Sequence, residues 1–318
     1  MSSPHPVAVV IPSWNTLDLL GECLDSVRAQ DVPIELLVVD NGSADGTVEY
    51  LAREQVRCLA LPVNRGFAAA VNLGVAATAA EAVLVLNADA VLEQGCLRDL
   101  AAALAGDPRL AGAQPRILQL EPGRPRRADD AKLYSAGQGL LADGRAVELA
   151  AGAEQSPRWL EPRAVFGVCG AACLFRREAF ERLGGYDERY VSFYEDVDLN
   201  VRARIAGWEF AYVPGAVAWH LGNASWQLGF ERPAAENARL VARNRLATQA
   251  KFMPARALPR ITAVELASLA QAARQRRLRA TLRGKIEGLR WLPSLWRERR
   301  RLGREGDLRA PRLWLGRG

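Results

Sequence analysis

Short apolar runs alternate with amphipathic stretches along the first third of the chain. Four runs are apolar over almost their whole length: 7–11 (VAVVI), 34–39 (IELLVV), 57–61 (RCLAL) and 82–86 (AVLVL). A strand that is buried on both faces of a parallel sheet has this pattern. Between the runs, apolar residues recur at helical spacing, as at Leu20, Leu24 and Val27. The alternation predicts right-handed β–α–β units and a mainly parallel central sheet flanked by helices, which is an α/β fold.

Polar side chains follow three of these strands at the point where each strand ends. Pro12-Ser13 follows the first, Asp40 the second, and Asn87 and Asp89 the fourth. Carboxyl ends of parallel strands share one edge of the sheet, where ligands bind. Turn chemistry alone would also place Asn and Asp after a strand. Three such ends together favour a nucleotide pocket, and a carboxylate beside a second oxygen ligand suits Mg2+ or Mn2+.

The second half of the chain changes character. Residues 119–165 are polar and proline-rich, with a hairpin-turn pattern at Asp143-Gly144, and we expect a surface excursion beside the site. The following pattern predicts a strand over 167–175, a helix over 177–183, a helix from about residue 195, and strands over 208–213 and 216–219.

An acidic cluster opens the helix predicted from residue 195. Glu195, Asp196 and Asp198 fall in its first turn. The helix dipole favours acidic residues there, so capping is one explanation. The cluster also has aromatic neighbours, including Tyr194, and is denser than capping requires. A catalytic role is the second explanation.

Composition narrows the class of protein. The chain has 318 residues, of which 49% are hydrophobic and 25% charged, as in ordinary globular proteins. Its five cysteines are scattered and odd in number, which favours reduced thiols, a cytoplasmic location and no zinc site. The start MSSPHP lacks a secretion-signal pattern, and no apolar run reaches membrane-spanning length. The glycine motifs of dinucleotide dehydrogenases and P-loop ATPases are missing.

Charge is distributed unevenly along the chain. Residues 251–318 contain 18 basic and 5 acidic residues, whereas residues 1–250 contain 24 basic and 31 acidic residues. Within the basic part, Leu282, Ile286, Leu289 and Trp291 are expected to form one apolar helix face surrounded by arginines. Residues 255–318 therefore predict peripheral docking on an anionic membrane surface at the inner face of the cell membrane. A solvated terminal helix is the alternative, and nucleic-acid binding is disfavoured because no recognised fold accompanies it.

Six sequence blocks, taken in order, resemble the large family 2 of inverting glycosyltransferases with the GT-A fold. They are VAVVIPSWN, LLVVDNGSADGT, NRGFAAAVN, VLNAD, GGYDERYVSFYEDVDLNVR and an element from His220 to Ser225. The block YEDVDL and the later Arg243-Asn244 resemble the rhamnosyltransferase-like branch. The resemblance implies a GT-A nucleotide-diphospho-sugar transferase domain over 1–250, with a nucleotide-binding half (1–118) and an acceptor or catalytic half (119–250). A basic helical C-terminal extension would follow over 251–318.

The same resemblance implies a reaction and a set of residues. A divalent cation (Mg2+ or Mn2+) would assist transfer of a sugar, such as L-rhamnose from dTDP-rhamnose, to a glycan or lipid-linked acceptor in polysaccharide or cell-wall assembly. Asp196 would be the catalytic base, and Asp89 and His220 would ligate the metal. The donor would contact Pro12, Ser13, Asn15, Asp40, Asn64, Arg65, Asn72 and Asn87. Around the acceptor or behind the base we expect Glu195, Asp198, Tyr194 and Arg243.

Elementary chemistry agrees with these roles. The acceptor hydroxyl must lose a proton as it attacks, and an anion at a helix N-terminus can take it. A metal ion held by a carboxylate neutralises the charge of the departing pyrophosphate. Two other classes stay open: a nucleotidyltransferase, which would need a phosphate loop where this chain has PSWN, and a domain that binds sugar nucleotides without catalysis. The oligomeric state is left open.

Overall fold

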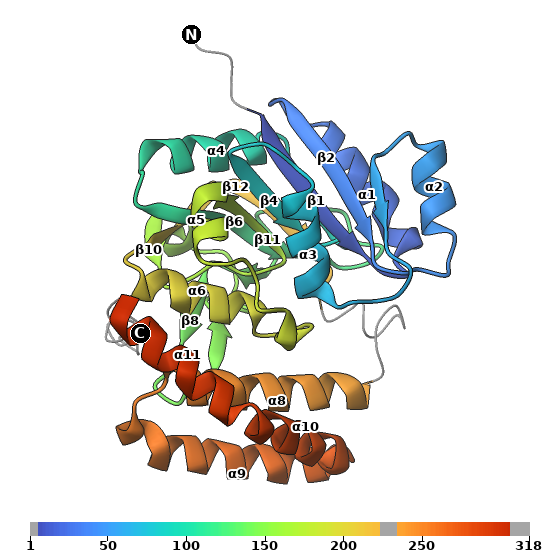
Figure 1. Ribbon diagram of the computed structural model, residues 1–318. Coiled ribbons are helices and arrows are strands. Elements are labelled where there is room, and N and C mark those ends of the chain that lie inside the picture. Colours follow the sequence, from blue (N-terminus) through green and yellow to red (C-terminus); the bar gives the residue numbers. More distant parts are fainter. Residues whose placement is uncertain (1–5, 223–233, 306–318) are drawn as a thin grey trace.

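A computed structural model describes residues 6–222 and 234–305 (Figure 1). Ser225 in the last resemblance block, and residues 306–318 of the basic extension, lie outside the described residues. Among the helices of the described part, none is both long and apolar enough to cross a membrane.

A mixed ten-stranded sheet forms the centre of the molecule, in the order β10-β12-β6-β11-β4-β1-β2-β3, with β5 paired to β12 and β7 to β6. Its strands are β1 (Val7–Ser13), β2 (Ile34–Asp40), β3 (Cys58–Ala60), β4 (Ala82–Leu86), β5 (Ala90–Leu92), β6 (Leu110–Gln119), β7 (Leu133–Ser135), β10 (Arg163–Val165), β11 (Ala172–Arg176) and β12 (Glu209–His220). The four strands predicted from apolar runs, β1 to β4, pair in parallel. β11 pairs with β4 and β6 in the antiparallel direction. The α/β GT-A-like fold class is confirmed.

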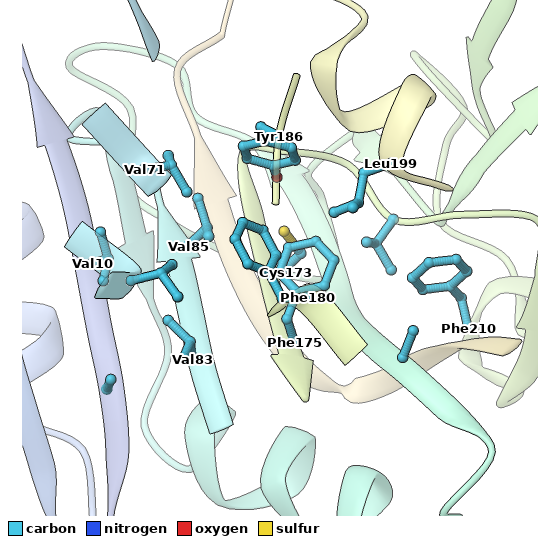
Figure 2. Packing of buried hydrophobic residues seen from close by; sticks show 14 of the residues in the cluster. Val10, Val71, Val83, Val85, Cys173, Phe175, Phe180, Tyr186, Leu199 and Phe210 are labelled. Atoms are coloured by element: carbon cyan, nitrogen blue, oxygen red, sulfur yellow. The ribbon is translucent and has the colours of Figure 1, made fainter. Parts of the chain in front are cut away.

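Helices cover both faces of this sheet (Figure 1). They are α1 (Leu17–Arg28), α2 (Thr47–Arg53), α3 (Phe67–Ala76), α4 (Cys96–Gly106), α5 (Arg177–Arg182) and α6 (Glu195–Ile205). On one face, Val10 and Val85 pack with Val71 of α3 and Phe180 of α5 (Figure 2). On the other face, alternate residues of the same strands pack against α1 and α4. This two-sided burial explains why the strands read as unbroken apolar runs.

Three predicted strands differ from the observed ones. The strand expected over 167–175 begins only at Ala172, because the backbone N–H groups of Cys169 and Gly170 donate to the side chains of Gln114 and Asp196 instead. The two strands expected over 208–213 and 216–219 form one strand, β12, whose pairing with β6 shifts register between Val213 and Val217.

The prediction that residues 119–165 form a surface excursion is wrong in part. β7 contributes to the main sheet, and β8 (Gln138–Leu140) and β9 (Ala146–Glu148) form the expected hairpin around Asp143-Gly144. Leu133, Ser135 and Gln138 are all buried. The segment is therefore partly core, a fact hidden by its polar composition.

Four C-terminal helices pack together beside the sheet domain: α8 (Ala234–Phe252), α9 (Leu258–Arg274), α10 (Leu278–Arg290) and α11 (Leu292–Glu305) (Figure 1). α10 approaches α8 closely through Gly284, where an added Cβ would lie 2.1 Å from the carbonyl oxygen of Arg239. Short 3-10 turns occur at Pro157–Leu160, Glu188–Tyr190 and Ala255–Ala257. The domain division at residues 250 and 251 stays a prediction, and that position lies near the end of α8.

The apolar face predicted in the basic extension is correct for three of its four residues. Leu282, Ile286 and Leu289 are exposed on α10. Trp291 instead packs against Tyr190 and the guanidinium of Arg243. Trp291 lies between α10 and α11 and anchors these two helices to Tyr190 and to Arg243 of α8.

Candidate active site

A cavity of about 380 Å³ lies at the edge of the sheet where β1, β2 and β4 end. Its wall includes nine of the side chains expected from the sequence: Pro12, Ser13, Asn64, Asn87, Asp89, Tyr194, Glu195, Asp196 and His220. These residues come from parts of the chain up to about 200 positions apart, and the sheet brings them together because its strand ends share one edge.

Sheet pairing places Asp89 and His220 side by side. β5 runs antiparallel to β12, and Ala90 pairs with His220. As a result, Oδ1 of Asp89 lies 3.0 Å from Nε2 of His220, and Nδ2 of Asn87 lies 3.2 Å from the same nitrogen. All three side chains come from the sheet edge, so their spacing is set by strand register.

The chemistry of this trio fits a divalent cation. The Oδ1 atom of Asn87 and the Nδ1 atom of His220 are buried without a hydrogen-bond partner. Unpaired buried polar atoms are rare and call for a partner. Within residues 6–222 and 234–305, no cluster of three or more His, Cys, Asp or Glu side chains has the geometry of a metal site. Asp89 and His220 are fewer side chains of these types than such a cluster has, so a cation held by them and by the amide oxygen of Asn87 would take its remaining ligands from a bound substrate.

Asp196 also lines the cavity, from the first turn of α6. Its Oδ2 accepts hydrogen bonds from the backbone N–H of Gly170 at 3.1 Å and from Nε2 of Gln138 at 2.9 Å. No lysine or arginine of the described residues forms an ion pair with it. Loss of hydration raises the pKa of Asp196 above its usual range, although the hydrogen bonds oppose this effect. The carboxylate thus holds a proton more readily than a surface aspartate.

The backbone just before Asp196 is strained. Val191, Phe193 and Tyr194 all have positive φ angles, between 67° and 69°. Such a conformation is costly for bulky residues and persists only where surrounding contacts enforce it. Nδ2 of Asn244 on α8 donates to the carbonyl oxygens of Tyr190, Ser192 and Phe193 at 2.7–2.9 Å.

Arg243 holds the same loop as Asn244, and we call these two residues the clamp. Its guanidinium donates to the carbonyl oxygens of Arg189 and Tyr190. It does not line the cavity, and its contacts explain how a residue on α8 acts on the segment that carries Asp196. The Arg243-Asn244 pair noted in the sequence therefore holds the loop from residue 189 to residue 193.

Asp198, two residues beyond Asp196, faces away from the cavity. It is fully buried and bonds to Nζ of Lys251 at 2.7 Å and to Nε of Arg202 at 2.6 Å. Burial alone would raise its pKa, but the charges of Lys251 and Arg202 lower the pKa to about 2. Lys251 also contacts Glu298 of α11 at 3.1 Å. We call Asp198, Arg202, Lys251 and Glu298 the ion cluster.

Four other expected donor residues lie outside the cavity lining. Asn15 accepts a hydrogen bond from the backbone of Ala44, which ties the ends of β1 and β2 together. Asp40 is buried, and its Oδ1 has no hydrogen-bond partner. Arg65 is exposed, and its guanidinium lies 3.6 Å from Glu188. Their roles toward a donor stay predictions.

Asn72 is the fourth. Its amide donates to the carbonyl oxygen of Tyr186, and its oxygen accepts from the backbone N–H of the same residue. It joins α3 to the loop after Gly185, which is a structural use of the side chain. Contact of Asn72 with a donor stays a prediction.

Sequence reasoning missed several residues of the wall. Tyr134, Gln138 and Ala146 line the cavity from the segment that was expected at the surface. Tyr134 packs edge-on against the ring of His220, with ring centres 4.6 Å apart. No local pattern distinguishes these residues, because β7, β8 and β9 are three residues long each. Asn41 and Trp14 also line the cavity, and their position beside strand ends was the available signal.

Comparison with protein families gives one match. The model described as "Glycosyl transferase family 2" matches residues 8–184, more than half of the chain. A curated relative from Mycobacterium tuberculosis, N-acetylglucosaminyl-diphospho-decaprenol L-rhamnosyltransferase, is 32% identical over 218 residues. That alignment covers 60% of this chain and 68% of the relative.

Solved structures share the fold. The crystal structure of GalNAc-T7 with UDP, GalNAc and Mn2+ aligns with a TM-score of 0.64 at 15% identity, over 92% of this chain and 56% of that chain. The present chain thus spans just over half of that protein's length. The mannosyltransferase PcManGT from Pyrobaculum calidifontis, in complex with GDP-Man and Mn2+, aligns with a TM-score of 0.52 at 20% identity, over 98% of this chain and 87% of that chain.

Proposed function

Since the chain belongs to glycosyltransferase family 2, we propose that it is an inverting, metal-dependent enzyme in which Asp196 is the catalytic base. It is a nucleotide-sugar-dependent glycosyltransferase. The observation that carries the proposal is that one cavity contains both the Asp89–His220 pair and the Asp196 carboxylate, which forms no ion pair with a cation of the described residues.

Separate groups of residues would bind the donor and hold the cation. Pro12, Ser13 and Asn64 line the donor end of the cavity, and the unpaired oxygen of Asp40 is an acceptor for a donor N–H or hydroxyl. Asp89, His220 and Asn87 would hold a divalent cation, which when bound neutralises the charge of a pyrophosphate leaving group. Mn2+ in GalNAc-T7 and PcManGT supports the choice of cation.

Asp196 takes the proton of the acceptor hydroxyl. The hydroxyl oxygen attacks the anomeric carbon while the bond from that carbon to the pyrophosphate oxygen breaks, so one displacement inverts the sugar centre. Its raised pKa brings the base closer to the operating pH, where such groups work best. No second nucleophilic carboxylate is needed.

The relative from M. tuberculosis supports a finer choice of substrates. Its name gives L-rhamnose as the sugar and a decaprenol-linked acceptor. We therefore propose dTDP-L-rhamnose as the first donor to test and a lipid-linked glycan as the acceptor, in polysaccharide assembly.

A panel of donors tests the proposal. Release of nucleoside diphosphate from dTDP-L-rhamnose, UDP-N-acetylglucosamine and GDP-mannose is measured with MnCl2 and with EDTA. We expect turnover of at least one donor with MnCl2, loss of turnover with EDTA, and loss in Asp196→Asn. Binding of a donor without any metal-dependent turnover would instead support a non-catalytic domain, and release of pyrophosphate from a nucleoside triphosphate would support a nucleotidyltransferase.

The exposed side of α10 supports docking on an anionic membrane. Leu282, Ile286 and Leu289 lie on one side of the helix and are 41–52% exposed. Arg279, Arg283 and Arg290 lie within three positions of these apolar residues along the helix. Apolar side chains beside arginines suit an acidic lipid surface.

Flotation with vesicles tests this surface. The protein should float with vesicles that contain phosphatidylglycerol, and the triple substitution L282S, I286S and L289S should abolish flotation. L266S is the matched control, because Leu266 is 63% exposed on α9. Equal flotation of the wild type and the triple variant would exclude α10 as the docking surface. Truncation is a poor substitute here, because α10 and α11 pack against α8.

A further inference from the structure

Gln138 lies between two carboxylates. Its Nε2 donates to Oδ2 of Asp196 at 2.9 Å and to Oε1 of Glu148 at 3.1 Å. Its Oε1 accepts from Nδ2 of Asn200 at 2.8 Å. An amide nitrogen has two hydrogens, and both are used here. The side-chain amide of Gln138 therefore cannot flip, since its oxygen would then face two carboxylates.

Local structure fixes this arrangement. Gln138 and Glu148 are directly opposite each other in the β8–β9 hairpin. Asn200 stands one helical turn after Asp196 on α6, and its Nδ2 also donates to the carbonyl oxygen of Val168. The hairpin and the helix thus meet at the Gln138 amide, which is 2% exposed.

Glu148 can gain a proton at the cost of one long hydrogen bond. Its Oε2 accepts from the hydroxyl of Ser135 at 2.6 Å, and that hydroxyl also lies 3.2 Å from the carbonyl oxygen of Gly137. A serine has one hydroxyl hydrogen. The Ser135 oxygen itself accepts from Nε2 of Gln114 at 2.9 Å and from the backbone N–H of Gly137 at 3.2 Å. A protonated Glu148 would therefore donate to Ser135 in place of the longer of these two contacts, while the serine's own hydrogen turns to the carbonyl oxygen of Gly137.

Asp196 and Glu148 face no neutralising cation among the described residues, where no ion pair to either one occurs. Two further carboxylates, Glu195 and Asp89, line the same cavity as Asp196. The remaining titratable groups nearby are thiols and phenols: Cys169, Cys173, Tyr134, Tyr186 and Tyr194. Burial raises the pKa of each of these groups, so they are neutral at ordinary pH. The charge of Glu148 therefore acts on Asp196 with little compensation.

We propose that Gln138 and Glu148 are positioning residues for the base: Gln138 fixes the carboxylate of Asp196, and the charge of Glu148 controls how strongly Asp196 holds a proton. This inference rests on the proposed role of Asp196. Loss of hydration, followed by the charge of Asp196, raises the pKa of Glu148 to about 7. Glu148 therefore changes charge close to neutral pH, and Asp196 becomes a stronger base as it does so.

The Glu148→Gln variant tests the coupling. Glutamine imitates the protonated glutamic acid, because its amide can accept from Gln138 and donate to Ser135. In the wild type, kcat for hydrolysis of the best donor of the panel should rise in a step near pH 7, as the base becomes stronger. The variant should lose this step. A step that persists unchanged in Glu148→Gln would overturn the inference.

Glu154→Gln is the matched control. Glu154 lies in the same segment, and its side chain is 72% exposed. The same loss of charge there should leave the pH profile of kcat unchanged.

Gln138→Met tests the amide itself. Loss of the hydrogen bond to the base should lower kcat about 10- to 100-fold, while Kd for the nucleoside diphosphate stays at the wild-type value. A variant that loses nucleotide affinity with kcat unchanged would contradict the positioning role.

Thermal unfolding gives a readout that needs no turnover. Between the ordinary pKa of a glutamate and the raised value of about 7, the folded protein binds more protons than the unfolded chain, so its stability falls as the pH rises. The gain in Tm of Glu148→Gln over the wild type should therefore be larger at pH 8 than at pH 5. This gain should shrink in the Asp196→Asn background, where the neighbouring charge is absent.

The outcomes separate the two hypotheses. If no donor turns over but the gain in Tm depends on Asp196, the proposed function fails and the coupling stands. If donors turn over, Asp196→Asn is inactive, and both the pH step and the gain in Tm are insensitive to Glu148, the inference alone fails.

Discussion

The two sides of α6 place the same chemical group in opposite surroundings. On the cavity side, Asp196 is held by the Gln138 amide and by backbone N–H groups, without a cation, and its pKa is raised. On the other side, Asp198 bonds to Lys251 and Arg202, and its pKa is about 2. The first of these cations comes from α8, far along the chain, and the second comes from α6 itself, one turn after Asp198. A carboxylate's role is therefore decided by what packs against the helix, and less by its place on the helix.

The largest expected effect is a loss of turnover on replacing Asp196, which distinguishes its role from that of Asp198. Asp196→Asn should lower kcat about 10²- to 10⁴-fold, because the acceptor hydroxyl loses its base. Its Tm should not fall, since the raised pKa shows that the charge is unfavourable in the folded state. Donor turnover and thermal unfolding measure the two quantities. Asp198→Asn is the matched change, and it should lower Tm. Equal losses of Tm in both variants would end the distinction.

Breaking the ion cluster should produce the next largest effect. Lys251→Met leaves the charge of Asp198 deeply buried, with Arg202 as its remaining close cation. Removal of one partner of a buried pair costs about 3–5 kcal/mol of unfolding free energy. Urea unfolding measures it. Lys132→Met is the control, because Lys132 is 49% exposed and lies 3.5 Å from Glu154. A loss similar to that of the control would mean that the cluster contributes little.

Acid should weaken the Asp198 side selectively. The folded-state pKa of Asp198 is about 2, below the ordinary 3.8. Its contribution is therefore present above about pH 4 and is lost as the pH falls through 2, and it amounts to about 2 kcal/mol. The difference in unfolding free energy between the wild type and Lys251→Met should shrink from pH 5 to pH 2. A constant difference over that range would show that the pKa of Asp198 is not lowered by Lys251.

The smallest expected effect follows from removing the hydroxyl of Tyr190, at the edge of the ion cluster. Tyr190 donates its hydroxyl to Asp198 at 3.3 Å and lies 3.1 Å from the hydroxyl of Thr248. Tyr190→Phe should cost about 1 kcal/mol of unfolding free energy, as for one hydrogen bond, with donor turnover near that of the wild type. A large loss of turnover would mean that the two sides of α6 are coupled through this ring.

The sequence predicted the elements that are defined by local patterns. β1, β2 and β4 are almost entirely apolar because helices cover both faces of the sheet, and their polar ends share one edge because the strands run parallel. Asp89, His220 and Asp196 were expected together from the resemblance, and they line one cavity.

Other features depend on packing that no local pattern contains. Gln138 and Glu148 come from short strands in a polar segment, so their neighbours follow only from the hairpin's position against α6. Lys251 belongs to a stretch that reads as a basic surface, yet its side chain is 3% exposed. Asn72 has the residue type of a donor ligand, and the loop after Gly185 uses its amide instead.

The clamp of Arg243 and Asn244 has a consequence for a chain that is being synthesised. The loop that carries the base is shaped by side chains about fifty positions later in the sequence. Asp196 cannot be aligned until α8, which begins at Ala234, has also emerged from the ribosome. A polypeptide that ends before α8 would therefore contain the base without the side chains that position it.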